Sequence, residues 1–282
     1  MGYNGGENRN HSEALMKNER TMMYMLTETS PFMMSFVIIT KEDNAIVVDG
    51  GRPDDVPLLL EYIGKRKVKG WFLTHPHDDH VTALSHILHN TPDAVDIERI
   101  YYHFPPYGFV AKYEHFEAKT LAEFFDLEVT FKNKFYVCKP NEHIEIDELS
   151  FDILFTFSPY LKSNAVNDAS MVFRVNGEKK SVLFLGDIGP EAGDELLRLQ
   201  QGNLRADYVQ MAHHGHMCCD ASVYMEIEPE ACFWCAPEWL YNEEPKYIRE
   251  RMYGEKMTRK WMEKMGVTQH YVTKDGTQSV EI

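Results

Sequence analysis

The sequence predicts an α/β fold of four layers, an αββα sandwich in which two β-sheets pack face to face between outer helices. Short runs of β-branched and aromatic residues alternate with segments whose apolar residues have helical spacing. Both halves of the chain show this alternation. Because helices and sheets each bury one apolar face, such a chain packs into layers of the two.

The first half of the chain opens with a predicted hairpin and continues with helices and strands in turn. The polar turn 41–44 separates two β-rich runs, and Gly64 stands where a helix would end. In chain order we expect strands at 36–39 and 45–48, a helix at 57–63, a strand at 70–74 and a helix at 81–89.

The second half continues the pattern after a Pro-Pro turn at 105–106. Asn176-Gly177 lies between two apolar runs and is a strong hairpin signal. We expect strands at 99–102, 142–146, 149–157, 171–175, 181–185, 208–212 and 231–235, helices at 112–125, 191–200 and 244–265, and a last strand pair around 276–277.

The domain organisation follows from length and composition. A chain of 282 residues is compatible with one large α/β core. Residues 1–21 are polar, rich in Gly and Asn and without a period, so we expect a flexible N-terminal arm there. Residues 22–282 are expected to form a single domain.

Charge and hydropathy exclude several function classes. The formal net charge is −15, from 44 acidic against 29 basic residues, which disfavours binding of bulk nucleic acid. No apolar run approaches the roughly 18 to 20 residues of a membrane span. The N-terminus has no basic region followed by an apolar one, so we expect a cytoplasmic protein acting on a small anionic substrate, with no membrane partner.

The five cysteines favour reduced thiols over a disulfide framework. Cys232 and Cys235 form a C-x-x-C, and Cys218 is adjacent to Cys219, so a structural zinc is an alternative. The segment CFWC is typical of an apolar buried strand. We therefore interpret these cysteines as core thiols.

The segment Thr74-His75-Pro76-His77-Asp78-Asp79-His80 places three imidazoles and two carboxylates directly after a predicted buried strand. Imidazole and carboxylate together suit zinc, iron or manganese. His75 and His77 alternate and can face one metal, whereas Asp79 and His80 can turn to a second. The sequence thus predicts two cations at the end of this strand.

Two further clusters of ligand-type residues follow other predicted strands. Asp187 ends the run LFLGD, and His213-His214 stand in MAHHGH. A carboxylate at a strand end can bridge two cations through its two oxygens. Asp187 would then hold them about 3.5 to 4 Å apart, the spacing used in two-metal hydrolysis.

These residues resemble the metallo-β-lactamase superfamily, through H-x-H-x-D-H at 75–80, Gly186-Asp187 and the D-G-G at 49–51. The resemblance runs from about Met22 to the C-terminus. Within the superfamily the chain looks most like the hydrolase domain of the DNA-internalisation competence proteins and its stand-alone relatives. That narrower likeness rests on the H-H-G at 213–215, the N-D-A-S at 167–170 and the T-x-D-G at 273–276.

The resemblance implies a metallo-β-lactamase fold and a ligand set. His75 and His77 would bind metal one, Asp79 and His80 metal two, and Asp187 both. One of His213 and His214 would complete a shell. His213 is preferred, with His214 as its neighbouring partner or as a proton donor, a role for which His216 is the alternative.

The chain departs from the superfamily at the third histidine of metal one, which usually precedes the bridging aspartate. The loop 167–170 stands there instead. Asp168 or His213 could fill this position. His270 is a candidate for the late histidine of the superfamily.

The implied cofactors are two divalent ions, zinc first, with manganese or iron as alternatives. Two cations lower the pKa of a shared water from about 15.7 toward about 7 and so supply a nucleophile, which Asp79 would orient. The expected reaction is hydrolysis of a phosphodiester or phosphoester. Hydrolysis of a lactone or thioester is the first alternative, followed by a di-iron redox protein and a catalytically silent binding module.

Overall fold

Strand residues alternate between two apolar environments, and this alternation builds the layers. The computed structural model describes residues 18–244 and 254–282. In β2 (Ser35–Ile39), Phe36 and Ile38 pack into one apolar cluster, whereas Val37 and Ile39 belong to another. The sheet is therefore apolar on both faces, which is the pattern of a sheet buried between two layers.

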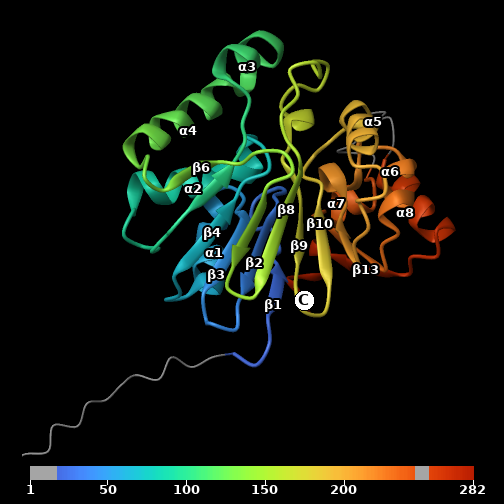
Figure 1. Ribbon diagram of the computed structural model, residues 1–282, viewed down its shortest axis with the longest axis horizontal. Coiled ribbons are helices and arrows are strands. Elements are labelled where there is room, and N and C mark those ends of the chain that lie inside the picture. The colour runs from blue at the N-terminus through green and yellow to red at the C-terminus, as the bar shows by residue number, and fades with distance from the viewer. Residues whose placement is uncertain (1–17, 245–253) are drawn as a thin grey trace, which may run out of the picture.

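Two sheets of seven strands each form the inner layers (Figure 1). The first sheet runs, in spatial order, β14 (Gln278–Glu281), β1 (Met22–Met25), β2, β3 (Ala45–Asp49), β4 (Val68–Phe72), β5 (Ile100–Tyr102) and β6 (Phe135–Val137). The second runs β13 (Gln269–Val272), β12 (Ala231–Trp234), β11 (Tyr208–Gln210), β10 (Ser181–Phe184), β9 (Val172–Asn176), β8 (Leu149–Phe155) and β7 (His143–Ile146).

Helices cover the outer faces and complete an αββα sandwich. The helices on the first sheet are α1 (Val56–Ile63), α2 (Asp78–Asn90) and α4 (Ala118–Thr130). Those on the second are α5 (Pro190–Leu199), α6 (Ala221–Ile227), α7 (Glu238–Tyr241) and α8 (Glu255–Lys264). Between the sheets lies a third cluster built on stacked aromatic rings, with Phe72 and Phe151 centred 4.3 Å apart. The predicted four-layer fold is confirmed.

Most predicted elements are found within a few residues of their expected bounds. The hairpin that becomes β2 and β3 pairs in register, and the Asn176-Gly177 turn joins β9 to β10. The thiols of Cys218, Cys219 and Cys232 are buried, as the core interpretation predicted. The short elements β1, β6 and α6 were not predicted.

Three predictions of local structure are wrong or only partly tested. The helix expected at 112–125 is two helices, α3 (Tyr107–Tyr113) and α4, because the backbone of Glu114 leaves the helical region at φ −148° and ψ 58°. The helix expected from 244 begins only at Glu255, and residues 245–253 lie outside the described part. So does most of the expected N-terminal arm.

The expected strand pair at the C-terminus is also wrong. The strands β13 and β14 lie in different sheets, where β13 pairs with β12 and β14 pairs with β1. A 3₁₀ turn at Thr273–Asp275 and Gly276, with φ +90°, lead the chain from one sheet to the other. Proximity in sequence suggested a hairpin, but each strand pairs with the edge of a different sheet instead.

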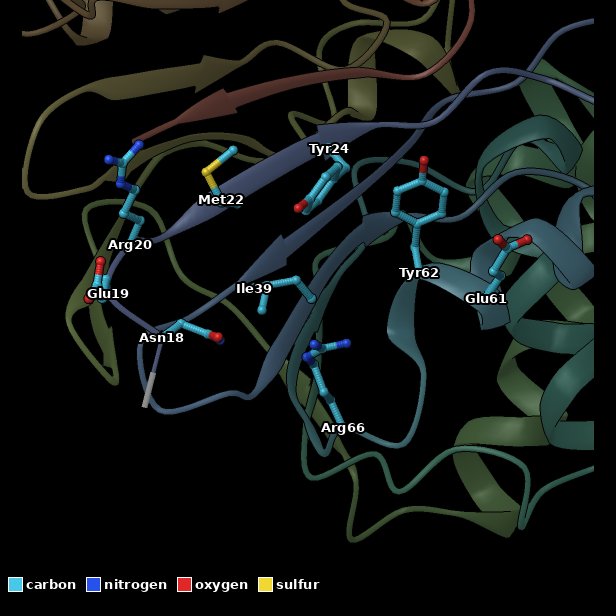
Figure 2. Close-up of a pocket in the computed structure, with 9 residues that line it drawn as sticks. All are labelled: Asn18, Glu19, Arg20, Met22, Tyr24, Ile39, Glu61, Tyr62 and Arg66. Atoms are coloured by element: carbon cyan, nitrogen blue, oxygen red, sulfur yellow. The ribbon is translucent and has the colours of Figure 1, made fainter. Parts of the chain in front are cut away.

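A hollow of about 620 Å³ lies on the outer side of the first sheet, between β1 and α1 (Figure 2). The rings of Tyr24 and Tyr62 face each other there, 5.2 Å between centroids. Its lining residues are Asn18, Glu19, Arg20, Met22, Tyr24, Ile39, Glu61, Tyr62 and Arg66. None of the predicted metal ligands lines this hollow.

The helices of the described residues include none with the length and apolarity needed to cross a bilayer.

Candidate metal centre

The histidine-rich segment leaves β4 and opens α2. His77 is the N-cap of α2, with extended φ and ψ, so His75 and His77 lie on the approach to the helix. Asp79 and His80 lie in its first turn, where a carboxylate is stabilised by the helix dipole. The four side chains are therefore fixed by a strand end and a helix start.

Asp187 reaches the same region from the end of β10. Gly186 precedes it with φ +56°, and a Cβ at Gly186 would lie 2.7 Å from the Cβ of Ser170. Only glycine fits this turn without displacement. The Ser170 hydroxyl accepts a 3.0 Å hydrogen bond from the Asp187 amide, which fixes the backbone behind the carboxylate.

His213 and His214 follow β11, which is parallel to β10. Both have left-handed backbones, with φ of 49° and 57°. Left-handed conformations at consecutive non-glycine residues cost energy and often occur at functional sites. The turn is held by a 3.0 Å hydrogen bond from the His213 amide to the Gly186 carbonyl.

The first ligand group consists of His75, His77 and Asp187, whose ligand atoms lie within 4.8 Å of one another. Nε2 of His75 is 3.0 Å from Nδ1 of His77 and 3.8 Å from Oδ2 of Asp187. These three atoms surround one point. Two imidazoles and a carboxylate are a typical set for a divalent transition metal.

The second ligand group consists of Asp79, His80 and His214, again within 4.8 Å of one another. Oδ2 of Asp79 is 3.0 Å from Nε2 of His214 and 3.5 Å from Nε2 of His80. All three side chains are buried.

Asp187 lies between the two groups, because its Oδ2 faces imidazoles of both. Oδ2 lies 3.4 Å from Nε2 of His80 and 3.6 Å from Nε2 of His214 in the second group. It also approaches Nε2 of His213, at 3.9 Å. Its Oδ2 is therefore within reach of a cation held by either group.

Several polar atoms of these groups are buried with no hydrogen-bond partner among the described residues. They include Nε2 of His80, Oδ1 of Asp187 and Nδ1 of His213. Buried polar atoms without partners are rare in native proteins and call for an explanation such as a bound ion. The donor set and its orphaned atoms fit divalent metal ions.

The second group is supported by partners that belong to the sheets. Nδ1 of His80 lies 2.7 Å from Oδ2 of Asp49, at the end of β3. Nδ1 of His214 lies 2.8 Å from the Cys235 carbonyl, just after β12. Such contacts to the outer nitrogen orient metal-binding imidazoles and fix their tautomer.

The first group has different supports. Nδ1 of His75 is 3.0 Å from the Thr74 hydroxyl. Nε2 of His77 is 3.6 Å from Oε1 of Glu114, which lies between α3 and α4. This leaves Nε2 of His75 and Nδ1 of His77 directed at each other and at the first group.

The electrostatics of the site favour a positive charge at its centre. Burial lowers the pKa of His80, but Asp187, Asp79 and Asp49 outweigh burial and raise it well above the usual value. Burial acts to raise the pKa of the Asp187 carboxyl. The neighbouring His80 acts in the opposite direction, and the pKa is held well below its usual range. The three carboxylates thus stabilise the positive charge of a protonated His80. Divalent metal ions would place a positive charge in the same position.

His213 was expected to complete a ligand shell, with His214 beside it, and the two rings face different residues. His214, and not His213, lies with Asp79 and His80, and its Nε2 points at them. His213 lies beside Asp187 and belongs to neither group, and burial lowers its pKa to about 3. A neutral imidazole is the form that binds a metal.

The other candidate residues lie elsewhere among the described residues. Oδ1 of Asp168 accepts a 2.8 Å hydrogen bond from the Gly189 amide, and Asp168 belongs to neither ligand group. His270 accepts a 3.0 Å hydrogen bond from the Trp234 indole and also lies outside both groups. The His216 ring is 4.4 Å from that of His213, with Nδ1 3.3 Å from Oε1 of Glu255.

Sequence reasoning missed two residues that contact candidate ligands. Asp49 entered only as part of the D-G-G likeness, although a carboxylate at the end of a buried strand could have been recognised by the reasoning used for Asp187. Glu114 has no comparable signal. It lies in a segment that reads as continuous helix, and its contact with His77 is purely tertiary.

A sequence model of the metallo-beta-lactamase superfamily matches residues 31–216, about two thirds of the chain. This span contains every residue of the two ligand groups. No curated protein sequence matches the chain.

Several solved structures share the fold. The metallo-beta-lactamase fold protein YhfI from Bacillus subtilis is 13% identical with a TM-score of 0.58, over 94% of this chain and 100% of that one. A diphosphatase from the PhnP family is 14% identical with a TM-score of 0.50, over 93% and 98%. CmlA, a diiron β-hydroxylase from Streptomyces venezuelae, is 11% identical with a TM-score of 0.54, over 94% of this chain and 55% of CmlA.

Proposed function

The chain belongs to the metallo-beta-lactamase superfamily of metal-dependent hydrolases, and from this premise we propose that it uses two metal ions to hydrolyse a phosphodiester or phosphoester in a small anionic substrate. One observation carries the proposal. Two groups of three ligand side chains meet at a single oxygen, Oδ2 of Asp187. A shared carboxylate between two such groups is the arrangement of two-metal hydrolysis.

The ligand assignment follows the directions of the ring nitrogens. Metal one would be held by Nε2 of His75, Nδ1 of His77 and Nε2 of His213. His213 then fills the position of the missing third histidine. Asp187 would bind both ions.

Metal two would be held by Asp79, His80 and His214, through Oδ2 of the carboxylate and Nε2 of both imidazoles. When bound, the two ions would supply a nucleophilic water at neutral pH and neutralise charge on the reacting group. The Asp79 carboxylate, which belongs to this group, would orient that water. Both nitrogens of His214 are engaged, Nε2 with Asp79 and Nδ1 with the Cys235 carbonyl.

The proton for the leaving group is then best supplied by His216. Its ring stands beside that of His213, outside both ligand groups, and its Nδ1 is 3.3 Å from Oε1 of Glu255. A buried carboxylate behind an imidazole is a common support for general acid catalysis. The Glu255 side chain is fully buried.

The substrate class rests on charge and chemistry. A net charge of −15 repels polyanions, so a small substrate whose charge is met by the ions is favoured over nucleic acid. A diphosphatase shares this fold, but at 14% identity the likeness extends to the fold alone.

The proposal is tested on the purified full chain loaded separately with zinc, manganese and iron. Metal content is measured by elemental analysis, and turnover is assayed with bis(p-nitrophenyl) phosphate, p-nitrophenyl phosphate, a lactone and a thioester. We expect close to two metals per chain and phosphoester turnover that falls on the order of a thousandfold in Asp187→Ala. Asp93→Ala, an exposed carboxylate after α2, serves as the matched control.

Each other outcome points to a different function. Turnover of the lactone or thioester alone would overturn the phosphoester assignment and leave a hydrolase. Bound iron with oxygen consumption and no hydrolysis would favour redox chemistry, as in the diiron relative of this fold. A chain that binds no metal would overturn the proposal entirely.

A further inference from the structure

Glu114 connects three segments that are distant in sequence. It lies in the helical insertion, which we define as residues 103–134 between β5 and β6 and which contains α3 and α4 (Figure 1). Its Oε1 is 3.6 Å from Nε2 of His77. Its Oε2 accepts a 2.8 Å hydrogen bond from the amide of Val166, in the loop between β8 and β9.

The backbone around Glu114 is shaped for these contacts. The Glu114 amide closes α3 with a 2.8 Å hydrogen bond to the Val110 carbonyl, and its own φ and ψ then leave the helical region. The Glu114 carbonyl accepts from the Glu117 amide as the next turn begins. A segment with helical propensity is thus interrupted at the residue that faces a candidate metal ligand.

His77 is supported by a different part of the fold from the imidazoles of the second group. The outer nitrogen of His80 lies against Asp49 at 2.7 Å, and that of His214 lies against the Cys235 carbonyl at 2.8 Å. Those partners belong to strand ends of the two sheets. Glu114 belongs to the insertion, so the outer nitrogen of His77 faces an element outside the sheets.

The side chains concerned are enclosed but not fully buried. His77 is 16% exposed and Glu114 13%, against 0% for His80 and Asp49. A charged acceptor in such a setting interacts more strongly than in water, because few solvent molecules compete for the imidazole N–H. The contact can therefore hold the ring with Nδ1 turned inward.

We infer that Glu114 is a positioning residue for metal one: it holds the His77 ring so that Nδ1 faces the first ligand group, and the helical insertion thereby sets the metal affinity of that group. This inference rests on the metal centre of the proposed function. Loss of such a supporting contact typically weakens metal binding by about 10- to 100-fold.

A purely structural role for Glu114 makes a different prediction. If the carboxylate serves only to accept from Val166, Glu114→Gln keeps a suitable acceptor and should behave as the wild type. If the carboxylate positions His77, the loss of its charge should weaken metal binding even though the insertion stays in place. Glu114→Gln therefore separates the two roles, and Glu114→Ala removes both contacts.

The experiment is competition for zinc between the full chain and a chromogenic chelator, which resolves the two metals by affinity. We expect Glu114→Gln to weaken one of the two metals by about tenfold or more, with Glu114→Ala weaker still and the other metal changed far less. Glu123→Gln is the matched control, because Glu123 is an exposed carboxylate on α4 of the same insertion and pairs with Lys119. Urea unfolding of the metal-free proteins checks that Glu114→Gln leaves the fold intact.

The inference is overturned if Glu114→Gln binds both metals as the wild type does, or if it weakens both equally. The readout is independent of substrate. Two metals bound without phosphoester turnover would contradict the proposed function and leave this test valid, whereas a wild type that binds no metal would overturn both.

Discussion

The two ligand groups lie side by side but are supported in different ways. In the second group, Asp79, His80 and His214 are buried, and the outer nitrogens of both imidazoles lie against groups at strand ends. In the first group, His77 is partly exposed and its outer nitrogen faces the helical insertion. The second group is thus supported by strand ends of the sheets, and the first in part by the helical insertion.

This difference should appear first in stability. Asp49→Ala would leave His80 buried beside Asp187 and Asp79 without its 2.7 Å partner, and would leave the Thr74 amide and hydroxyl without their acceptor. Breaking a buried charged pair typically costs about 3 to 5 kcal/mol. We expect that decrease in the free energy of unfolding of the metal-free protein, measured in urea.

Two variants serve as matched comparisons. One is Glu114→Gln, and the other is Asp54→Ala, which removes an exposed carboxylate from the segment that follows Asp49. Both should change the free energy of unfolding by less than about 1 kcal/mol. If Glu114→Gln destabilised the chain as much as Asp49→Ala, the contrast between a group held by the core and a group held by the insertion would be wrong.

Asp168 tests whether the first group has a further ligand. Burial raises its pKa to about 6, against about 3.9 in an unfolded chain. Between these values the folded state binds more protons than the unfolded state, so stability is lost as pH rises from about 4 to about 6. A pKa difference of about 2 corresponds to about 3 kcal/mol of stability. We expect Asp168→Asn to regain this stability.

In the metal-free protein, Asp168→Asn should match the wild type in urea unfolding at pH 4 and exceed it by up to about 3 kcal/mol at pH 7. Asp194→Asn, an exposed carboxylate on α5, should show no such dependence. The affinity for both metals should be unchanged. A selective loss of one metal in Asp168→Asn would instead make Asp168 a ligand and give the first group a support from the sheets.

The sequence predicted the parts of the site that depend on strand ends. His75, His77, Asp79 and His80 follow β4 of the first sheet, and Asp187 follows β10 of the second. Strand ends are local features that the residue pattern marks. The strand alternation predicted the layers for the same reason, since side-chain direction in a strand is a local property.

What could not be predicted depends on backbone turns and on tertiary contacts. The left-handed conformations of His213 and His214 determine the directions of the two rings, and no residue pattern predicts these conformations. The break at Glu114 interrupts good helical spacing for the sake of contacts with His77 and Val166. The chain likewise passes from one sheet to the other after β13. This crossing depends on which sheet edge is free to pair with β14, which is a tertiary property.

The smallest expected effect separates His213 from His214. With His214 in the second group and His213 beside Asp187, each variant should affect a different metal. In zinc competition, His213→Ala should weaken the metal already affected by Glu114→Gln, and His214→Ala the other one, each by about tenfold or more. His86→Ala, an exposed histidine on α2, is the control.

Combining the variants gives the sharper form of this test. Glu114 acts on metal one through His77, and His213 would bind metal one directly. In the double variant Glu114→Gln, His213→Ala, both losses of affinity should therefore fall on metal one. Adding His214→Ala should weaken metal two. If His213→Ala and His214→Ala weakened the same metal, His213 would belong to the second group. The first group would then hold its metal with His75, His77 and Asp187 alone, and its dependence on the helical insertion would be larger still.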